Sequence, residues 1–138
     1  MKVYDAVARV LKDEGVENLV CYPRQALIDA CAAPDFPARI VLVVSNVASA
    51  LALERATRAG IATAVLDHKK FPSREAFDEA MQARIVAAGA ELVCLAGFMR
   101  LLTPAFVNAF AGRMINVHPS LLPAFPGLHA HEIGRAHV

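Results

Sequence analysis

The chain has 138 residues, about one domain in length, and 14 lysine and arginine residues nearly balance 13 aspartate and glutamate residues. A net charge of +1 argues against a nucleic-acid-binding surface, because such surfaces usually carry a clustered basic excess. Hydrophobic residues make up 57% and the longest aliphatic run is Ile40–Val44, so the composition excludes a disordered chain and offers no membrane-spanning segment.

Hydrophobic periodicity predicts helices and strands that alternate along the chain. Helices are expected over residues 3–14, 25–33, 49–59 and 74–88, and a short helix is expected to open at Thr103-Pro104. Strands are expected over residues 16–22, 39–45, 61–66, 91–95 and 114–117. Ser73 is a typical N-cap, whereas Gly60 and Gly89 stand where helices commonly end.

This alternation is typical of βαβ units and predicts a single α/β domain over residues 1–138. We expect a Rossmann-like fold, with a mostly parallel sheet and helices on both faces. Cys21, Cys31 and Cys94 are widely spaced among apolar residues, which indicates buried thiols in a reducing compartment rather than disulfides. Because residues 1–14 lack an apolar secretory core, we expect a cytoplasmic protein without membrane partners.

Two segments that follow predicted strands carry residues suited to chemistry, since parallel sheets bind ligands outside the carboxyl ends of their strands. The first segment is AGFMR, residues 96–100, and the second covers residues 116–127. Asn116 and His118 are two residues apart, so their side chains point the same way on an extended backbone. An amide donor beside an imidazole suits stabilisation of a developing oxyanion together with proton transfer near neutral pH.

Each of these residues also has an ordinary structural interpretation. An isolated Asn-x-His pair is more often engaged in local hydrogen bonds than in catalysis. Phe98 and Met99 are suited to lining a core or a pocket, whereas Arg100 is suited to holding a carboxylate. The spacing of His129, His131 and Glu132 matches no strong zinc pattern, so we expect no metal site.

Residues 25–132 resemble the phosphoribosylglycinamide formyltransferases, folate-dependent enzymes of purine biosynthesis. The resemblance rests on three motifs, SREAFD (73–78), LAGFMRLLTPAF (95–106) and INVHPSLLPAFPGLHAHE (115–132). It implies formyl transfer from 10-formyltetrahydrofolate, as co-substrate, to the amine of glycinamide ribonucleotide, with neither a metal nor a covalent intermediate.

The same resemblance implies roles for individual residues. Asn116 would hold the formyl oxygen, and His118 would stabilise the tetrahedral intermediate and relay a proton. The arginines at 74 and 100 would help to seat the cofactor. The implied folate-binding residues are Arg74, Met99, Arg100, Leu101, Leu102 and Asn116.

Both ends of the chain depart from the family pattern. Residues 1–23 resemble the opening of thiamine-diphosphate enzymes, without their cofactor-binding residues. Cys21-Tyr22-Pro23-Arg24 stands where the family has a glycine-rich loop for the ribonucleotide phosphate. Residues 132–138 resemble a translated sequencing adapter, and no residue there matches the family's catalytic aspartate.

From these departures we expect a truncated formyltransferase fold, with an atypical segment 1–23, a non-native tail 132–138 and little activity. A second hypothesis is a genuine variant in which residues 16–22 occupy the place of the family's first strand. The alternative functions are an inactive α/β fragment, or a related enzyme that formylates methionyl-tRNA or hydrolyses formyltetrahydrofolate. The expected partners are small-molecule substrates only, without nucleic acid.

Overall fold

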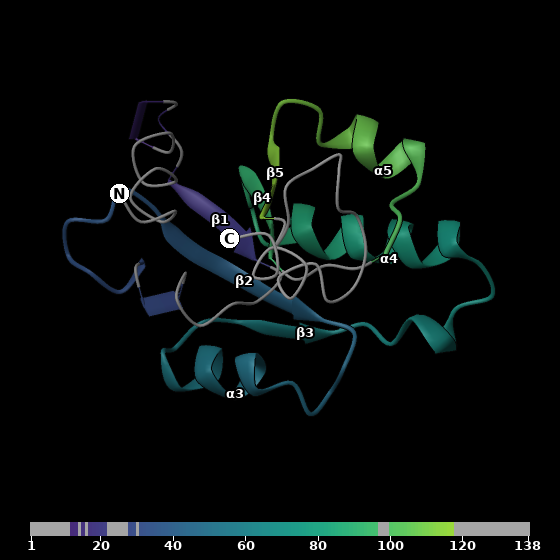
Figure 1. Cartoon of the computed structure of the whole chain (residues 1–138), viewed down its shortest axis with the longest axis horizontal. Helices are drawn as coiled ribbons and strands as arrows, with labels where there is room; N and C mark the ends of the chain where they lie inside the picture. Colours follow the sequence, from purple (N-terminus) through teal and green to yellow (C-terminus); the bar gives the residue numbers. More distant parts are fainter. Residues whose placement is uncertain are drawn as a thin grey trace, which may run out of the picture.

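The computed structural model describes residues 12–13, 15, 17–21, 28–29, 31–96 and 100–117. Within these ranges, five parallel strands form one sheet in the order β3-β2-β1-β4-β5 (Figure 1). The strands are β1 (Asn18–Cys21), β2 (Arg39–Ser45), β3 (Thr63–Val65), β4 (Leu92–Ala96) and β5 (Met114–Val117). The bounds of each strand agree with its predicted range to within two residues, and the predicted parallel α/β fold is confirmed.

Strand β1 lies at the centre of this sheet. Leu19 is paired with Ile40 of β2 on one side and with Leu92 of β4 on the other. Residues 18–21 thus form the central strand of the described sheet. The chain builds outward from β1 to β3 and then returns to the other side of β1, so the strand order reverses between β1 and β4. Such a reversal is where open parallel sheets commonly bind ligands.

Helices cover both faces of the sheet. They are α3 (Leu51–Arg58), α4 (Arg74–Ala87) and α5 (Pro104–Ala109), with a short 3-10 helix η1 (His68–Lys70) before α4. Helix α3 packs on one face, whose buried cluster, the α3 cluster, comprises Ile28, Ala38, Ile40, Val43, Leu53, Ala56, Leu92 and Cys94. Helices α4 and α5 pack on the other face (Figure 1). The α4–α5 cluster comprises Leu42, Val44, Leu66, Phe77, Met81, Ile85, Val93, Leu95, Phe106 and Phe110.

Strand β2, RIVLVVS, is apolar between its ends because both of its faces are buried, and it carries a bulge opposite β1. The register with β1 skips Val41, so Ile40 and Val43 share the α3 cluster although they are three residues apart. Leu42 and Val44 pack in the α4–α5 cluster. A strand buried on both faces requires apolar residues at consecutive positions.

The residues predicted to begin two helices do so. The Ser73 hydroxyl accepts the backbone N–H of Ala76 at 3.1 Å, at the start of α4. The Thr103 hydroxyl accepts the N–H of Phe106 at 3.3 Å, and Pro104 is the first residue of α5. These hydroxyls satisfy N–H groups that a helix cannot pair internally.

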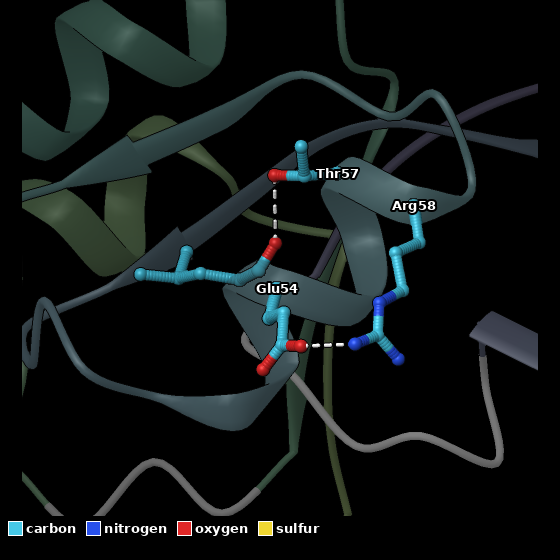
Figure 2. A network of polar contacts seen from close by, with 4 residues as sticks. Glu54, Thr57 and Arg58 are labelled. Atoms are coloured by element: carbon cyan, nitrogen blue, oxygen red, sulfur yellow. Dashed lines mark hydrogen bonds and ion pairs between the residues drawn. The ribbon is translucent and has the colours of Figure 1, made fainter.

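Helix α3 begins two residues later than predicted. Its N-cap residue is Ala50, whose side chain makes no capping hydrogen bond. On its exposed side Glu54 and Arg58 form an ion pair (Figure 2). The Thr57 hydroxyl donates to the Leu53 carbonyl oxygen at 2.9 Å. Both charged side chains are more than half exposed, so the pair contributes only about 0.3–0.5 kcal/mol.

Two of the three cysteines are described with their side chains: Cys94 is buried in the α3 cluster, and Cys31 packs against it, half-buried. Burial, with a smaller contribution from the neighbouring Cys94, raises the pKa of Cys31 from 9.0 to about 12. The prediction of a buried thiol is therefore confirmed for Cys94, whereas Cys31 is half-buried and the Cys21 side chain lies outside the described residues. No helix in the described part of the chain is both long and apolar enough to span a membrane.

Candidate functional site

Strands β4 and β5 end side by side at the carboxyl edge of the sheet. Leu95 is paired with Asn116, and Ala96 with Val117. Asn116 is exposed, whereas Leu95 is buried in the α4–α5 cluster. The two segments singled out in the sequence therefore leave the sheet from adjacent positions. Gly97–Met99 and His118, which belong to those segments, lie outside the described residues.

The stretch 100–103 leads from β4 into α5, and helix α4 contacts both of its ends. The guanidinium carbon of Arg100 lies 5.3 Å from the centroid of the Phe77 ring. The Asp78 carboxylate accepts the backbone N–H of Thr103 at 2.7 Å. Phe77 and Asp78 are 2% and 3% exposed, so α4 holds this stretch through two buried side chains.

Two leucines occupy the middle of this stretch. Leu102 is half-buried and packs against the α4–α5 cluster, whereas the side chain of Leu101 is 80% exposed. Arg74 is the exposed first residue of α4, one turn before Phe77 and Asp78 on the same helix. Since α4 starts shortly after β3 ends, Arg74 lies at the same edge of the sheet as Arg100, Leu101, Leu102 and Asn116.

Sequence reasoning missed two polar residues near this edge. Asn46 follows β2 directly, and its amide nitrogen lies 3.3 Å from Nδ1 of His68 in η1. The His68 ring meets the Phe77 ring edge-on, at a centroid distance of 6.4 Å and an angle of 86°. Phe77 thereby connects residues that follow β2 and β3 with Arg100, which follows β4. The only signal in the sequence was that both residues come just after predicted strands.

A cavity of about 550 Å³ lies at the other edge of the sheet. Its lining residues are Ile28, Asp29, Ala32, Arg55, Arg58 and Ala59. The end of α3 leads into the amino end of β3, so this cavity is remote from the carboxyl edge and includes none of the predicted site residues.

Within the described ranges, no group of three or more histidine, cysteine or acidic side chains is arranged to hold a metal ion. His129, His131 and Glu132, whose spacing predicts no metal site, lie outside those ranges.

Comparison with protein families matches residues 22–136 to the family described as Formyl transferase. The chain belongs to the formyl transferase family. The matched range includes both candidate segments, 96–100 and 116–127, and the predicted family resemblance is confirmed.

Two relatives illustrate this formyl transferase similarity. The phosphoribosylglycinamide formyltransferase of Escherichia coli (strain K12) is 51% identical over 108 residues, which cover 78% of this chain and 51% of that protein. The trifunctional purine biosynthetic protein adenosine-3 of Drosophila pseudoobscura pseudoobscura is 54% identical over 110 residues, 78% of this chain and 8% of that protein. The chain thus spans about half the length of the bacterial relative and a small part of the insect one.

Solved formyl transferase structures have the same fold. The phosphoribosylglycinamide formyltransferase of Brucella melitensis superposes with a TM-score of 0.79 at 42% identity, over 88% of this chain and 66% of that one. Glycinamide ribonucleotide transformylase 1 of Geobacillus kaustophilus gives a TM-score of 0.80 at 35% identity, over 89% of this chain and 69% of that one. These likenesses confirm the Rossmann-like fold class.

Proposed function

We propose that the chain carries the formyl transfer chemistry of purine biosynthesis, from 10-formyltetrahydrofolate to the amine of glycinamide ribonucleotide. The names of the bacterial relatives support formyl transfer to phosphoribosylglycinamide, and the family resemblance implies the folate as formyl donor. The observation that carries the proposal is the pairing of Leu95 with Asn116, because it brings the ends of β4 and β5 together at one edge. The two longest motifs of the family resemblance include these two strand ends, and this supports a shared site.

The proposed reaction has a tetrahedral intermediate and no covalent enzyme adduct. The substrate amine attacks the formyl carbon, and the formyl oxygen takes up negative charge. Asn116, exposed at the end of β5, donates its amide N–H to that oxygen. His118 takes the proton from the attacking nitrogen and delivers it to N10 of the folate as the bond from the carbon to N10 breaks.

On the folate side, we propose that Leu101 and Leu102, with Met99, form an apolar wall against the pterin ring. Leu101 is suited to this role because its large side chain is 80% exposed beside the strand ends. Arg74, exposed at the first position of α4, offers a guanidinium for the folate carboxylates, and Arg100 also helps to seat the cofactor. The reaction needs no metal ion, and its partners are small molecules of the cytoplasm.

We propose that the ribonucleotide phosphate binds weakly. Strand β1 ends at Cys21, beside the reversal of strand order where phosphates commonly bind. The next residues, Tyr22-Pro23-Arg24, include no glycine, and Pro23 has no N–H to donate. Weak binding of the remote phosphate reduces turnover, because that binding energy helps to orient the amine.

The test is an assay of labelled formyl transfer to glycinamide ribonucleotide by the 138-residue chain. We expect slow transfer above the uncatalysed rate, and a further decrease of about 100-fold in Asn116→Ala. Asn108→Ala, which changes an exposed asparagine of α5, is the matched control and should leave the rate unchanged.

A folded chain that neither binds 10-formyltetrahydrofolate nor transfers its formyl group contradicts the proposal. Release of formate without ribonucleotide favours the hydrolase alternative. Transfer to methionyl-tRNA in place of glycinamide ribonucleotide favours the related formyltransferase.

A further inference from the structure

Asp78 is a carboxylate in a place where the surrounding helix face is apolar. It is 3% exposed, and its neighbours one and two turns along α4 include Met81 and Ile85, both buried in the α4–α5 cluster. Burial of a carboxylate is unfavourable unless a partner compensates for the lost water. The partner is the Thr103 backbone N–H, 2.7 Å from the Asp78 oxygen and 25 residues later in the chain.

This contact completes the start of α5. In a capping box, the third helical residue accepts the N–H of the N-cap residue through a Glu or Gln side chain. The third residue of α5 is Phe106, which has no acceptor in its side chain. Asp78 supplies that acceptor from another helix, while the Thr103 hydroxyl makes the other half of the box with the Phe106 N–H.

The preceding residue of α4 holds the other end of the same stretch. Phe77 lies under the Arg100 guanidinium and is itself contacted edge-on by the rings of His68 and Phe71, at 6.4 and 5.6 Å between centroids. The ring is therefore fixed by residues outside the stretch. Residues 100–103 are thus connected to consecutive, buried positions of one helix.

We propose that Phe77 and Asp78 are positioning residues that fix residues 100–103 before a ligand binds. The inference rests on the proposed function and deepens it, because this stretch carries the leucines assigned to the folate wall. If residues 100–103 are ordered before the folate arrives, the folate binds more tightly, since less of the protein has to become ordered on binding. Asp78 acts through the Thr103 N–H and does not itself meet the ligand.

The first experiment compares Asp78→Ala with Asp78→Asn in the full 138-residue chain. Calorimetry with 10-formyltetrahydrofolate gives the Kd, and amide hydrogen exchange gives the protection of the Thr103 N–H. For Asp78→Ala we expect Kd to rise about tenfold and Thr103 exchange to accelerate by a similar factor, because hydrogen bonds to carboxylates are strong. Asp78→Asn keeps an acceptor oxygen, so it should recover most of the affinity.

Ile85→Ala is the control, because it changes a buried residue of the same helix about two turns beyond the two positions that hold the stretch 100–103. It should lower Tm at least as much as Asp78→Ala while Kd stays within about twofold. If Ile85→Ala raises Kd as much as Asp78→Ala does, the effect is one of general stability and the inference is overturned. An unchanged Kd in a folded Asp78→Ala variant also overturns it.

Phe77→Leu provides a second measurement that does not depend on the folding of Asp78→Ala. It keeps an apolar side chain but removes the ring under Arg100, and we expect Kd to rise about threefold. An unchanged Kd in this variant contradicts the positioning role of Phe77. A wild-type chain that binds no folate overturns the proposed function and the inference with it, whereas normal wild-type binding with unchanged variants overturns the inference alone.

Discussion

Leu95 and Asn116 stand next to each other in the parallel pairing of β4 and β5, yet one is buried and the other exposed. A substitution of Leu95 should therefore mainly lower stability, whereas a substitution of Asn116 should mainly lower activity. We expect Leu95→Ala to lower the free energy of unfolding by about 3 kcal/mol, because it leaves a cavity in the α4–α5 cluster. Asn116→Ala should change it by less than about 0.5 kcal/mol and should mainly reduce formyl transfer.

Urea unfolding measures the free energy of unfolding of both variants, and the transfer assay measures their rate of formyl transfer. A large loss of stability in Asn116→Ala would show that its amide has a structural role and would count against its assignment to the formyl oxygen.

Leu101→Ser tests the folate wall with little effect on the fold. Because the Leu101 side chain is 80% exposed, we expect the free energy of unfolding to change by less than about 0.5 kcal/mol. The Kd for 10-formyltetrahydrofolate should rise about tenfold, since apolar area is no longer buried on binding. Val86→Ser, on a 63% exposed valine of α4, is the matched control and should keep the wild-type Kd. Equal affinities in the two variants would remove Leu101 from the site.

Ser73→Ala removes the hydroxyl that accepts the Ala76 N–H at the start of α4. We expect a loss of about 1 kcal/mol in the free energy of unfolding, or about 3–4 °C in Tm. Ser73→Asp keeps an acceptor and places a negative charge at the helix N-terminus, so it should retain the wild-type Tm. Thermal melting followed by circular dichroism distinguishes the two variants; equal melting temperatures would mean that the cap contributes nothing.

Burial of Cys31, whose pKa is raised to about 12, predicts a loss of stability at alkaline pH. Above pH 9.0 the thiol ionises in the unfolded chain but keeps its proton in the folded one. The unfolded state then binds fewer protons, so the free energy of unfolding falls as pH rises from 9.0 toward about 12. Cys31→Ala should flatten this part of the pH profile in urea titrations.

The same raised pKa predicts that Cys31 is alkylated slowly by iodoacetamide at pH 8.5, because the thiolate is the reactive form. Peptide mass spectrometry of the folded and urea-unfolded chains measures the rate at this site. Comparable rates in the two states would contradict the burial of the thiol.

Binding of the folate should be retained better than binding of the ribonucleotide. The motif matches on the folate side, Arg74 and residues 99–102, are intact, whereas residues 21–24 lack the glycines that let backbone N–H groups approach a phosphate. Calorimetry should therefore give a lower Kd for 10-formyltetrahydrofolate than for glycinamide ribonucleotide. Tight ribonucleotide binding without folate binding is the opposite result and would reject this assignment.

Features that depend on neighbouring residues could be predicted from the sequence. Ser73 and Thr103-Pro104 were identified as helix starts because capping involves residues only three positions apart. The strands could be predicted because their apolar runs are bounded by glycine, proline and polar residues. Helix η1 was not predicted, because a single turn of 3-10 helix carries no periodicity that distinguishes it from a loop.

Features that depend on tertiary packing could not be predicted in this way. The sequence indicates that Asp78 lies on a helix, but nothing local shows that it is buried or that it reaches Thr103, 25 residues further on. The same holds for Asn46 and His68, whose contact joins the segments after two different strands. The functional roles of all the predicted site residues stay predictions, and Met99 and His118 also lie outside the described residues.

The central position of β1 also has a consequence for the order of folding. The units β2-α3-β3 and β4-α5-β5 each form from a continuous stretch of chain, and no described strand pairing connects them except through β1. Leu19 must find Leu92 across about half of the chain, and such distant contacts form slowly because a long loop has to close first. The two halves of the sheet can thus pair their own strands separately, and the docking of four residues, Asn18–Cys21, together with the clusters on both faces, joins them into one cooperative unit.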